Sequence, residues 1–513
     1  MLVFELVVGL LLVGVVLALV ADRIELPYPA LLAVGGACLA LWRGVPELTL
    51  DPELALALFV APVLLDSGFD ASPRDIRANL RAVSVLALVV VVLTIAAVAW
   101  AAHELVPGMG WAPAVTLGAI VAPPDASAAT AVLRRLRPPH RLLVILEAES
   151  LFNDASALLV YRLAVGATMT GVFSGWSVVP MLLLTCGGGV LVGVVAARLF
   201  TWLSPRVEDL AAAILIQFLG TFGVWILAER LHLSAIVTMV AYAMTLGQLT
   251  PGIVGARRRI ASYAVWEVAV FVLNVLAFIL IGLQLRGIMT RLGASSGSEY
   301  YPAVAAVCGM VIGVRLVFWM AYNALVRWRQ REPVATVGSG LVIAWCGMRG
   351  IVTLATALAL PDGEPAGFPH RDFIVFASFC VVLSTLVVQG LTLRPLLLLL
   401  RLRDEGAVAR ELQLARFETA RAALVALETH AGEPGAVLLR REYAARVRVD
   451  GVGAASVLSL ADVQRHAASV QRHRLIELRA QRLIGDDAFH AAEQEIDLLE
   501  LGADVRVHPE ADD

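Results

Sequence analysis

The stretch RLLVILEAESLFNDASALLVYRLAV (residues 141–165) places a cluster of oxygen-bearing side chains inside an otherwise apolar segment. Its central part, residues 147–156, contains three acids, one asparagine and two serines. The apolar flanks make the whole stretch long enough for a membrane-spanning helix. Ionisable residues inside such a span are costly, so they indicate a functional site by default.

The rest of the chain has the composition of a membrane protein. Of its 513 residues, 59% are hydrophobic and 16% are charged, and the mean hydropathy is +0.80. Soluble domains average roughly 45–50% apolar and about 25% charged residues. The net charge of -3 says little about partners, and we expect a lipid bilayer rather than nucleic acid around this chain. The five cysteines and nine histidines show no spacing typical of a disulfide framework or a metal cluster, so no cofactor is expected.

Apolar segments recur along the first four fifths of the chain. We expect about thirteen transmembrane helices. They lie at about 2–20, 28–42, 52–69, 81–102, 112–133, 142–165, 176–199, 210–229, 233–249, 262–285, 301–326, 336–360 and 373–400. The predicted fold is an all-α polytopic membrane protein with a transmembrane domain at residues 1–401.

Arginine clusters in alternate loops indicate the orientation in the membrane. Examples are Arg74, Arg77 and Arg81; Arg134, Arg135, Arg137 and Arg141; and Arg257, Arg258 and Arg259. Loops on the cytoplasmic side carry most of the basic residues. We therefore expect a multi-pass protein of the cell membrane, with the N-terminus outside and the C-terminus in the cytoplasm.

The composition changes near residue 402. Residues 409–430 and 461–484 are rich in Arg and Glu with apolar residues at helical spacing. We predict a cytosolic helical tail at residues 402–513.

Three charged side chains from three predicted spans reach the same depth. At 1.5 Å per residue, Asp154 lies roughly 18 Å into its span, and Asp125 and Arg349 lie roughly 20 Å into theirs. Each is near the middle of a bilayer core of about 30 Å. Structural ion pairs would explain one acid with one arginine, but they would leave the second acid without a partner.

Helix geometry separates the polar residues of the sixth span. Ser150 and Asp154 are four apart, and Ser150 and Asn153 are three apart, so we expect these three to share a face. Glu149 is five residues before Asp154 and is expected to point elsewhere, toward a basic residue. Oxygen ligands suit hard cations. We therefore expect Ser150, Asn153 and Asp154 to present three oxygens to one cation.

The fifth and twelfth predicted spans are interrupted. IVAPPDASAAT (residues 120–130) has two adjacent prolines in mid-membrane, and WCGMRGIVT (residues 345–353) has a glycine on each side of Arg349. Accidental kinks are common in membrane helices, but two at matching positions indicate a transporter site. Spans 1–6 and 8–13 form two six-helix repeats, which the seventh span inverts relative to each other.

Three further charged residues belong to the same region. Asp66 lies toward the cytoplasmic end of the third span, where it lines an inner funnel or sits at the interface. Glu147 lies near the cytoplasmic entrance and is expected to be a vestibule charge or a ligand. Arg315 lies deep in the eleventh span and is expected to pair with an acid.

Several motifs resemble the first branch of the monovalent cation:proton antiporters, the NhaP-type and NHE-type sodium/proton exchangers. The motifs are ESLFND (149–154), FVLNVLAFILIGLQL (271–285), CGMRGIVTLATAL (346–358) and LVVQGLTLRPL (386–396). The resemblance covers about residues 1–400. It implies an ion site at Asn153, Asp154, Ser150 and Asp125, with sodium held by Asp154, Asp125 and Ser150. It also implies an ion pair between Glu149 and Arg349.

The same resemblance implies the mechanism and the assembly. We expect a secondary transporter, not an enzyme, that exchanges sodium, with lithium or potassium as other cations, for protons in pH and cation homeostasis. One proton per cation would make the exchange electroneutral. A homodimer is implied, with core helices at about 81–165 and 301–400 moving against the remainder. The sequence departs from the family at residues 124–126, Pro-Asp-Ala, where a threonine often precedes the acid.

Other functions fit the sequence less well. A potassium/proton antiporter remains the alternative within transporters. An intramembrane aspartyl protease would require Gly-x-Gly-Asp around its aspartates, and neither Asp125 nor Asp154 has that context. A cation channel would repeat a filter loop by symmetry, and no such repeat is found in the sequence.

Overall fold

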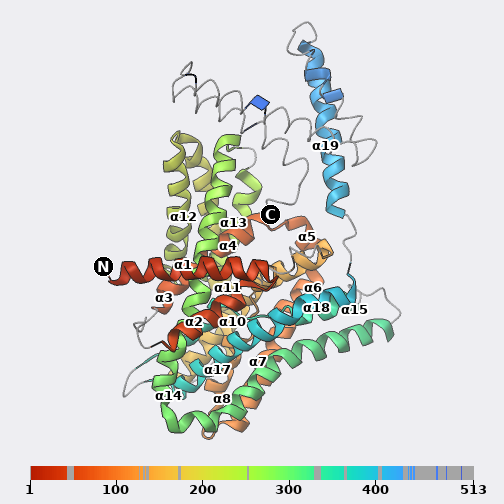
Figure 1. The fold of residues 1–513 in the computed structure, drawn as a ribbon. Helices are drawn as coiled ribbons and strands as arrows, with labels where there is room; N and C mark the ends of the chain where they lie inside the picture. Colours follow the sequence, from red (N-terminus) through yellow and green to blue (C-terminus); the bar gives the residue numbers. More distant parts are fainter. Residues whose placement is uncertain are drawn as a thin grey trace. The chain divides into compact units, whose positions relative to one another are not determined.

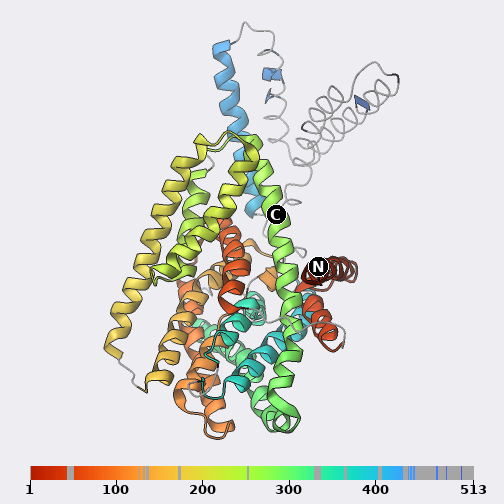
Figure 2. The same ribbon diagram turned by 90° about the vertical axis from the view of Figure 1, so that its left-hand side faces the viewer.

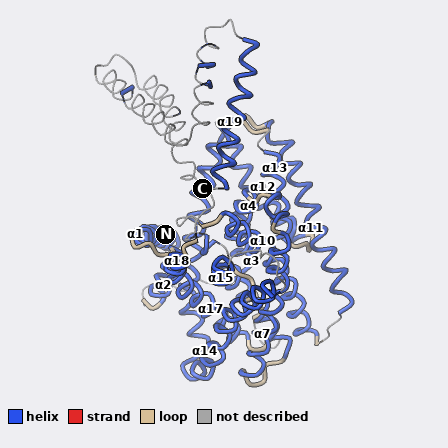
Figure 3. The backbone as a smooth tube through the Cα atoms, turned by 90° about the vertical axis from the view of Figure 1, so that its right-hand side faces the viewer, coloured by secondary structure: helices blue, strands red, loops and turns tan. Residues whose placement is uncertain are grey.

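The computed structural model is built from helices joined by short loops. It describes residues 2–42, 51–125, 127–130, 133, 138–171, 175–250, 253–328, 337–362, 367–402 and 407–430, with isolated residues beyond 436. No strand occurs in these ranges, as Figure 3 shows, so the all-α prediction is confirmed. The chain divides into two compact units, Met1–Asp404 and Glu405–Asp513.

The helices of the first unit follow the predicted spans closely (Figure 1). They are α1 (Leu2–Arg23), α2 (Tyr28–Ala40), α3 (Pro52–Ala55), α4 (Ala61–Asp70), α5 (Pro73–Ala78), α6 (Leu80–Ser84), α7 (Val91–Leu105), α8 (Trp111–Val121), α10 (His140–Thr170), α11 (Gly175–Leu203), α12 (Leu210–Arg230), α13 (Ala235–Leu249), α14 (Ala256–Trp328), α15 (Val337–Trp345), α16 (Ile351–Leu358), α17 (Arg371–Ser384) and α18 (Gly390–Leu400). Three π-helical segments continue neighbouring helices: η1 (Leu56–Val60), η2 (Val85–Val90) and η5 (Thr385–Gln389).

Side chains of the loops fix where several helices begin. The carboxylate of Asp51 accepts a hydrogen bond from Leu54 N at 3.0 Å, which caps α3. Asp209 caps α12 in the same way, accepting from Ala212 N at 2.7 Å. Such caps satisfy amides that have no partner in the first turn of a helix. Short polar loops therefore set the register of long apolar helices.

Among the described residues, eight helices are long and apolar enough to cross a membrane. Three shorter apolar helices, α2, α8 and α13, accompany them. The long α10 has 31 residues and carries the charged cluster of the opening stretch in its middle. The helix α14 contains two apolar stretches, Arg258–Leu292 and Tyr300–Tyr322, and the chain changes direction between them, as Figures 1 and 2 show. The number of thirteen spans stays a prediction.

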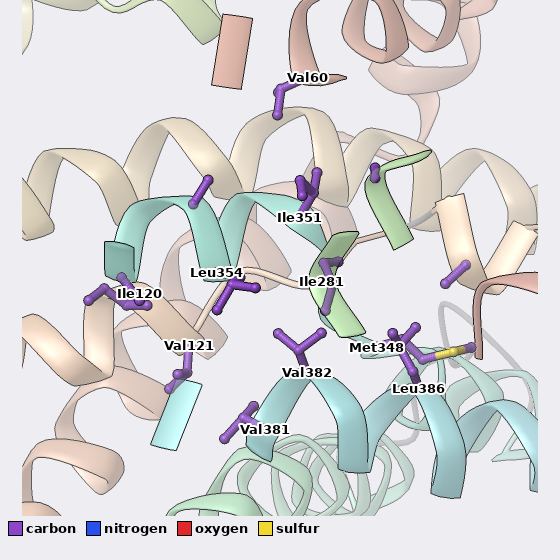
Figure 4. Close-up of a cluster of buried hydrophobic side chains, with 14 of the residues drawn as sticks. Val60, Ile120, Val121, Ile281, Met348, Ile351, Leu354, Val381, Val382 and Leu386 are labelled. Atoms are coloured by element: carbon purple, nitrogen blue, oxygen red, sulfur yellow. The ribbon is translucent and has the colours of Figure 1, made fainter. Parts of the chain in front are cut away.

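The two predicted interruptions are confirmed. The helix α8 ends at Val121, and helical structure resumes at Ser127. Residues 346–350 separate α15 from α16 without helical hydrogen bonding. Figure 4 shows apolar side chains from both broken helices and from α17 in one buried cluster around these interruptions. The broken backbone is therefore enclosed by protein, which is the condition under which it is tolerated at membrane depth.

In the second unit, α19 (Ala407–Ala426) covers most of the first helix predicted for the tail. The second predicted tail helix, residues 461–484, lies almost wholly outside the described residues.

Glycines allow α2 and α14 to pack with their backbones in contact. A Cβ atom built on Gly36 would lie 2.2 Å from Ile279 O, and one on Gly282 would lie 2.2 Å from Ala33 O. Small residues at a helix crossing allow such close approach in membranes. The glycine pair Gly189 and Gly193 does the same for α11, whose backbone lies against α13 at Thr238.

We expect Gly36→Ala and Gly282→Ala to destabilise the protein, because each methyl group would overlap a backbone oxygen of the neighbouring helix. Overpacking of this kind costs about 1–3 kcal/mol of unfolding free energy. Gly313→Ala is the control, because a Cβ there has no neighbour within 4 Å. Thermal unfolding of the purified protein in detergent measures the effect. Equal midpoints for the Gly282 and Gly313 variants would contradict the close contact.

Candidate functional site

The two interruptions cross each other and exchange hydrogen bonds. The backbone amide of Asp125 donates to Met348 O at 2.7 Å. In return, Arg349 donates from Nε to Val121 O at 3.0 Å and from Nη2 to Ala122 O at 3.1 Å. These two carbonyls lie at the end of α8, where the break leaves them without helical partners. Arg349 thus completes the C-terminus of α8.

The remaining contacts of Arg349 stay within the twelfth span and its neighbour. The guanidinium also donates to Gly347 O, and the backbone amide donates to Thr385 Oγ1 at 3.1 Å. Thr385 begins η5, so a π-helical turn of the last span supports the break. Arg349 is fully buried.

The predicted ion pair between Glu149 and Arg349 is wrong. Glu149 Oε1 accepts from Arg315 Nη1 at 2.5 Å, and Glu149 Oε2 accepts from Arg315 Nη2 at 3.0 Å. Both residues are 1% exposed. The prediction that Arg315 pairs with an acid is confirmed. Arg349 is not available to Glu149 because its donors hold backbone carbonyls, whereas Arg315 reaches Glu149 from α14 with both terminal nitrogens.

Asn153 lies with Glu149 rather than with Asp154. Its amide nitrogen donates to Glu149 Oε1 at 3.1 Å, and it does not line the cavity described below. The expected convergence of Asn153, Ser150 and Asp154 on one point is therefore wrong for Asn153. The i, i+4 spacing explains the outcome, since it joins Glu149 to Asn153 on one face of α10 and Ser150 to Asp154 on another.

A cavity of about 270 Å³ lies beside the crossing and contains the other expected site residues. Asp154, Asp125 and Ser150 all line it, and Asp154 is only 7% exposed. Its further polar residues are Asp66, Ser67, Asp70, Ser127, Thr130, Glu147, Asn274 and Thr353. The structure thus brings Asp66 and Glu147 to the same cavity. Five carboxylates and several hydroxyls therefore line one cavity.

Two helix starts hold the Asp125 carboxylate: the helical segment that resumes at Ser127, and α16. Its Oδ1 accepts from Ser127 N at 2.9 Å and from Ser127 Oγ at 2.6 Å. A Cβ on Gly350 would lie 1.7 Å from Asp125 Oδ2, so the carboxylate occupies the space that any other residue would fill. Gly350 is the N-cap of α16. The positive end of this half-helix therefore faces a carboxylate, a favourable arrangement.

Loop contacts fix the start of α10, which carries Asp154. Asp75 lies 3.5 Å from His140 Nε2 and 3.3 Å from Arg74 Nε. Burial raises the pKa of Asp75, but hydrogen bonds from its neighbours outweigh burial and hold the pKa below its usual value. Arg141 Nε donates to Asn79 Oδ1 at 2.8 Å. The entrance end of α10 is therefore tied to the α5–α6 region.

A second contact holds α10 just after Asp154. Ser156 Oγ donates to Ala87 O at 2.9 Å, within the π-helical segment η2. Wider turns of this kind leave carbonyls available and are frequent at functional sites. Ser156 belongs to the opening stretch, but its sequence gave no sign of this partner.

A second cavity, of about 780 Å³, lies about one helical turn from the first cavity, as measured along three helical segments. On α10, Asp154 lines the first cavity and Leu158 the second. On α16, the corresponding residues are Thr353 and Thr356. In the third span, Phe59 lines the first cavity and Leu56 the second, within η1. Only about one turn, roughly 5 Å, separates the two spaces along each helix.

The polar side chains of the cavity offer mainly carboxylate and hydroxyl oxygens. No group of three or more His, Cys, Asp or Glu side chains with metal-binding geometry occurs in the described part of the chain. Carboxylate and hydroxyl oxygens are the ligands that hard cations prefer. Sequence reasoning did not identify Ser127 and Thr353, because neither stands out until the broken helices are brought together.

Comparison with known proteins gives a consistent family. Residues 7–399 match the family described as "Sodium/hydrogen exchanger, transmembrane". An uncharacterized Na(+)/H(+) exchanger of Mycobacterium tuberculosis is 33% identical over 98% of this chain and 96% of its own length. A "Sodium, potassium, lithium and rubidium/H(+) antiporter" of Bacillus pumilus is 30% identical, with 72% of this chain matching 58% of that protein.

The fold is also similar to a solved structure. The sodium proton antiporter MjNhaP1 from Methanocaldococcus jannaschii at pH 8 superposes with a TM-score of 0.59 at 16% sequence identity. The match covers 75% of this chain and 98% of that chain. At this identity the likeness concerns the fold alone.

Thermodynamic coupling distinguishes the observed ion pair from the expected one. We expect Glu149→Gln and Arg315→Gln each to cost about 3–5 kcal/mol, because each leaves one buried charge without its partner. The double variant should lose much less than the sum of the two. A parallel cycle of Glu149→Gln with Arg349→Gln should be closer to additive, because Arg349 holds carbonyls instead.

The measurement is the unfolding midpoint in detergent, with purification yield as a second readout for variants that fold poorly. A larger coupling for the Glu149–Arg349 cycle than for the Glu149–Arg315 cycle would contradict the structure.

Proposed function

The chain belongs to the sodium/hydrogen exchanger family, and from this premise we propose that Asp154 carries cation and proton alternately across the membrane. The protein is a multi-pass cation/proton antiporter. The observation that best supports the role of Asp154 is its position. It is 7% exposed, lines the cavity beside the crossed helices, and has no ion pair among the described residues.

Competition between cation and proton follows from this position. A buried carboxylate without a compensating charge is strongly unfavourable. A bound proton removes the charge, and a bound sodium ion neutralises it. Either occupant therefore lets Asp154 lie in a low-dielectric environment, whereas the empty carboxylate does not. Because one group serves both, loading one ion requires release of the other.

The two cavities support alternating access. The space around Asp154 is separated from the second cavity by one helical turn on each of three helices. A small relative movement of α10 and α16 against the third span is then enough to transfer the site from one cavity to the other. The segment η1 lies at this boundary. We place the core helices at about 81–165 and 301–400 and the static part in the remainder.

Asp125 has a different role in this proposal. Two hydrogen bonds from Ser127 and the N-terminus of α16 stabilise its ionised form. It contributes a fixed negative charge that attracts the cation and does not carry a proton through the cycle. One proton then exchanges for one monovalent cation.

The remaining parts of the proposal concern the ion, the assembly and the orientation. Sodium is the proposed cation, and the Bacillus pumilus relative, whose name includes potassium, lithium and rubidium, makes these the ions to compare. We propose a homodimer in the cell membrane. We propose a cytoplasmic C-terminus, which the arginine-rich alternate loops support. The acids Asp66, Asp70 and Glu147 line the cavity of Asp154, and we propose that this cavity opens toward the cytoplasm.

The central test is Asp154→Asn. This isosteric change should give a folded protein without cation-dependent proton movement, because no titrating carboxylate remains at the site. The measurement is alkalinisation of proteoliposomes, followed with a pH-sensitive dye after sodium addition. Asp372→Asn, an exposed acid near the start of α17, is the control and should keep wild-type rates. Sodium-dependent alkalinisation by purified Asp154→Asn at the wild-type rate would refute the assignment.

The stoichiometry predicts that exchange is independent of membrane potential. A unit charge crossing 100 mV gains about 2.3 kcal/mol, so any net charge movement would change the rate. We expect equal rates of sodium/proton exchange with and without a potential set by valinomycin and a potassium gradient. Acceleration in the direction of net proton movement would mean that Asp125 or another acid carries a second proton. An Asp125→Asn variant that then became independent of potential would identify that acid.

A further inference from the structure

We infer that the side-chain hydroxyl of Thr353 is a ligand of the transported cation and helps to select it. This inference rests on the proposed function, since it assigns a further residue to the same site. Thr353 is the third residue of α16, the half-helix that follows the second interruption.

Thr353 lies on the face of α16 that is turned toward Asp125. Gly350 and Thr353 are three residues apart and therefore neighbours on one side of the helix. The Gly350 side is in contact with the Asp125 carboxylate, since a Cβ there would overlap Asp125 Oδ2. Thr353 follows at a rise of about 4.5 Å along the helix. It also lines the cavity that contains Asp154.

Thr353 is a buried residue at the cavity wall, and its hydroxyl makes no hydrogen bond to its own helix among the described residues. The residue is 1% exposed, and its hydroxyl takes part in none of the hydrogen bonds found within the described residues. Thr356, one turn later, donates to Val352 O at 2.6 Å, the usual solution for a threonine in a helix. Buried polar groups normally have a partner. A hydroxyl that lines the same cavity as Asp154 and Asp125 is therefore positioned for a ligand.

The chemistry of that ligand follows from the neighbours. The cavity already has negative charge from Asp154 and Asp125, so a cation is the favourable occupant. A cation that has shed water needs neutral oxygens beside its counter-charge, and a hydroxyl supplies a lone pair while its hydrogen remains free to donate to a carboxylate. Ser127 Oγ already donates to Asp125 at 2.6 Å, which leaves Thr353 as an unengaged hydroxyl at this end of the cavity.

The position also predicts an effect on selection. An additional oxygen held on a helix favours an ion small enough to contact it together with the carboxylates. Removing the oxygen should therefore weaken sodium and lithium more than potassium, whose larger shell is less dependent on one close ligand. A role in packing alone would not distinguish the three ions.

The experiment compares Thr353→Val, which keeps the shape and removes the hydroxyl, with Thr353→Ser, which keeps the hydroxyl. Thr116→Val is the matched control, because Thr116 is fully buried in α8 and its hydroxyl donates to Ala112 O of the same helix at 2.9 Å. The half-saturating concentrations of sodium, lithium and potassium are measured in proteoliposomes at one fixed pH. Stabilisation of the purified proteins against heating by each cation is measured in parallel, as a readout of binding without transport.

We expect Thr353→Val to raise the half-saturating concentration of sodium and lithium by about three- to tenfold, the usual effect of one lost neutral interaction. Potassium should change by less than about twofold, and sodium should stabilise the variant less against heating. Thr353→Ser should restore most of the sodium affinity. Thr353→Ala is the alternative hydroxyl-free variant if the valine variant does not fold.

Unchanged cation affinities in a folded Thr353→Val or Thr353→Ala protein would overturn the inference, and so would an equal loss for all three ions that serine does not restore. Either result would leave the proposed function intact as long as the wild type exchanges and Asp154→Asn does not. Failure of the proposed function would instead appear as wild-type proteoliposomes whose proton movement does not depend on sodium.

Discussion

The structure depends on the need to satisfy backbone groups at two helix breaks inside an apolar interior. Each break leaves amides and carbonyls without helical partners, and lipid offers no replacement. The breaks solve this reciprocally, since Asp125 N donates to Met348 O at 2.7 Å and Arg349 donates to the end of α8. The same crossing brings a carboxylate against the start of α16. The geometry of the proposed ion site is therefore a consequence of how the backbone is completed.

Charge is distributed around this crossing in two separate groups. Arg315 and Glu149 neutralise each other with two hydrogen bonds, and Asn153 adds a third contact to the same glutamate. Both arginines are thereby occupied, by an acid or by carbonyls, and no arginine pairs with Asp154 among the described residues. This separation leaves the Asp154 carboxylate without an arginine partner, as the proposed exchange requires. Had Arg349 or Arg315 bound Asp154, a fixed positive charge would compete with both sodium and the proton.

The helices around Asp154 are held firmly in place, but only a short barrier separates the two cavities. Ser156 and Arg141 hold α10 on both sides of Asp154, while glycine contacts lock α2 against α14. The π-helical segments lie at the boundary between the cavities and beside the breaks. Rigid helices can transfer a site between two spaces only when the barrier is short. One helical turn between Asp154 and Leu158 meets that condition.

The sequence by itself determined the helices and the two interruptions, because these follow from apolar length and from proline and glycine chemistry. It also identified the acids within apolar segments, because buried charge is costly. It also placed Ser150 with Asp154, since i, i+4 spacing is local. The tertiary structure alone decided which arginine pairs with Glu149, why Asn153 turns away from the cavity, and that Ser127 and Thr353 reach it. Spacing within one helix fixes a face, but the partner of that face comes from a distant helix. Only packing and the demand for satisfied backbone carbonyls settle which of two arginines remains available.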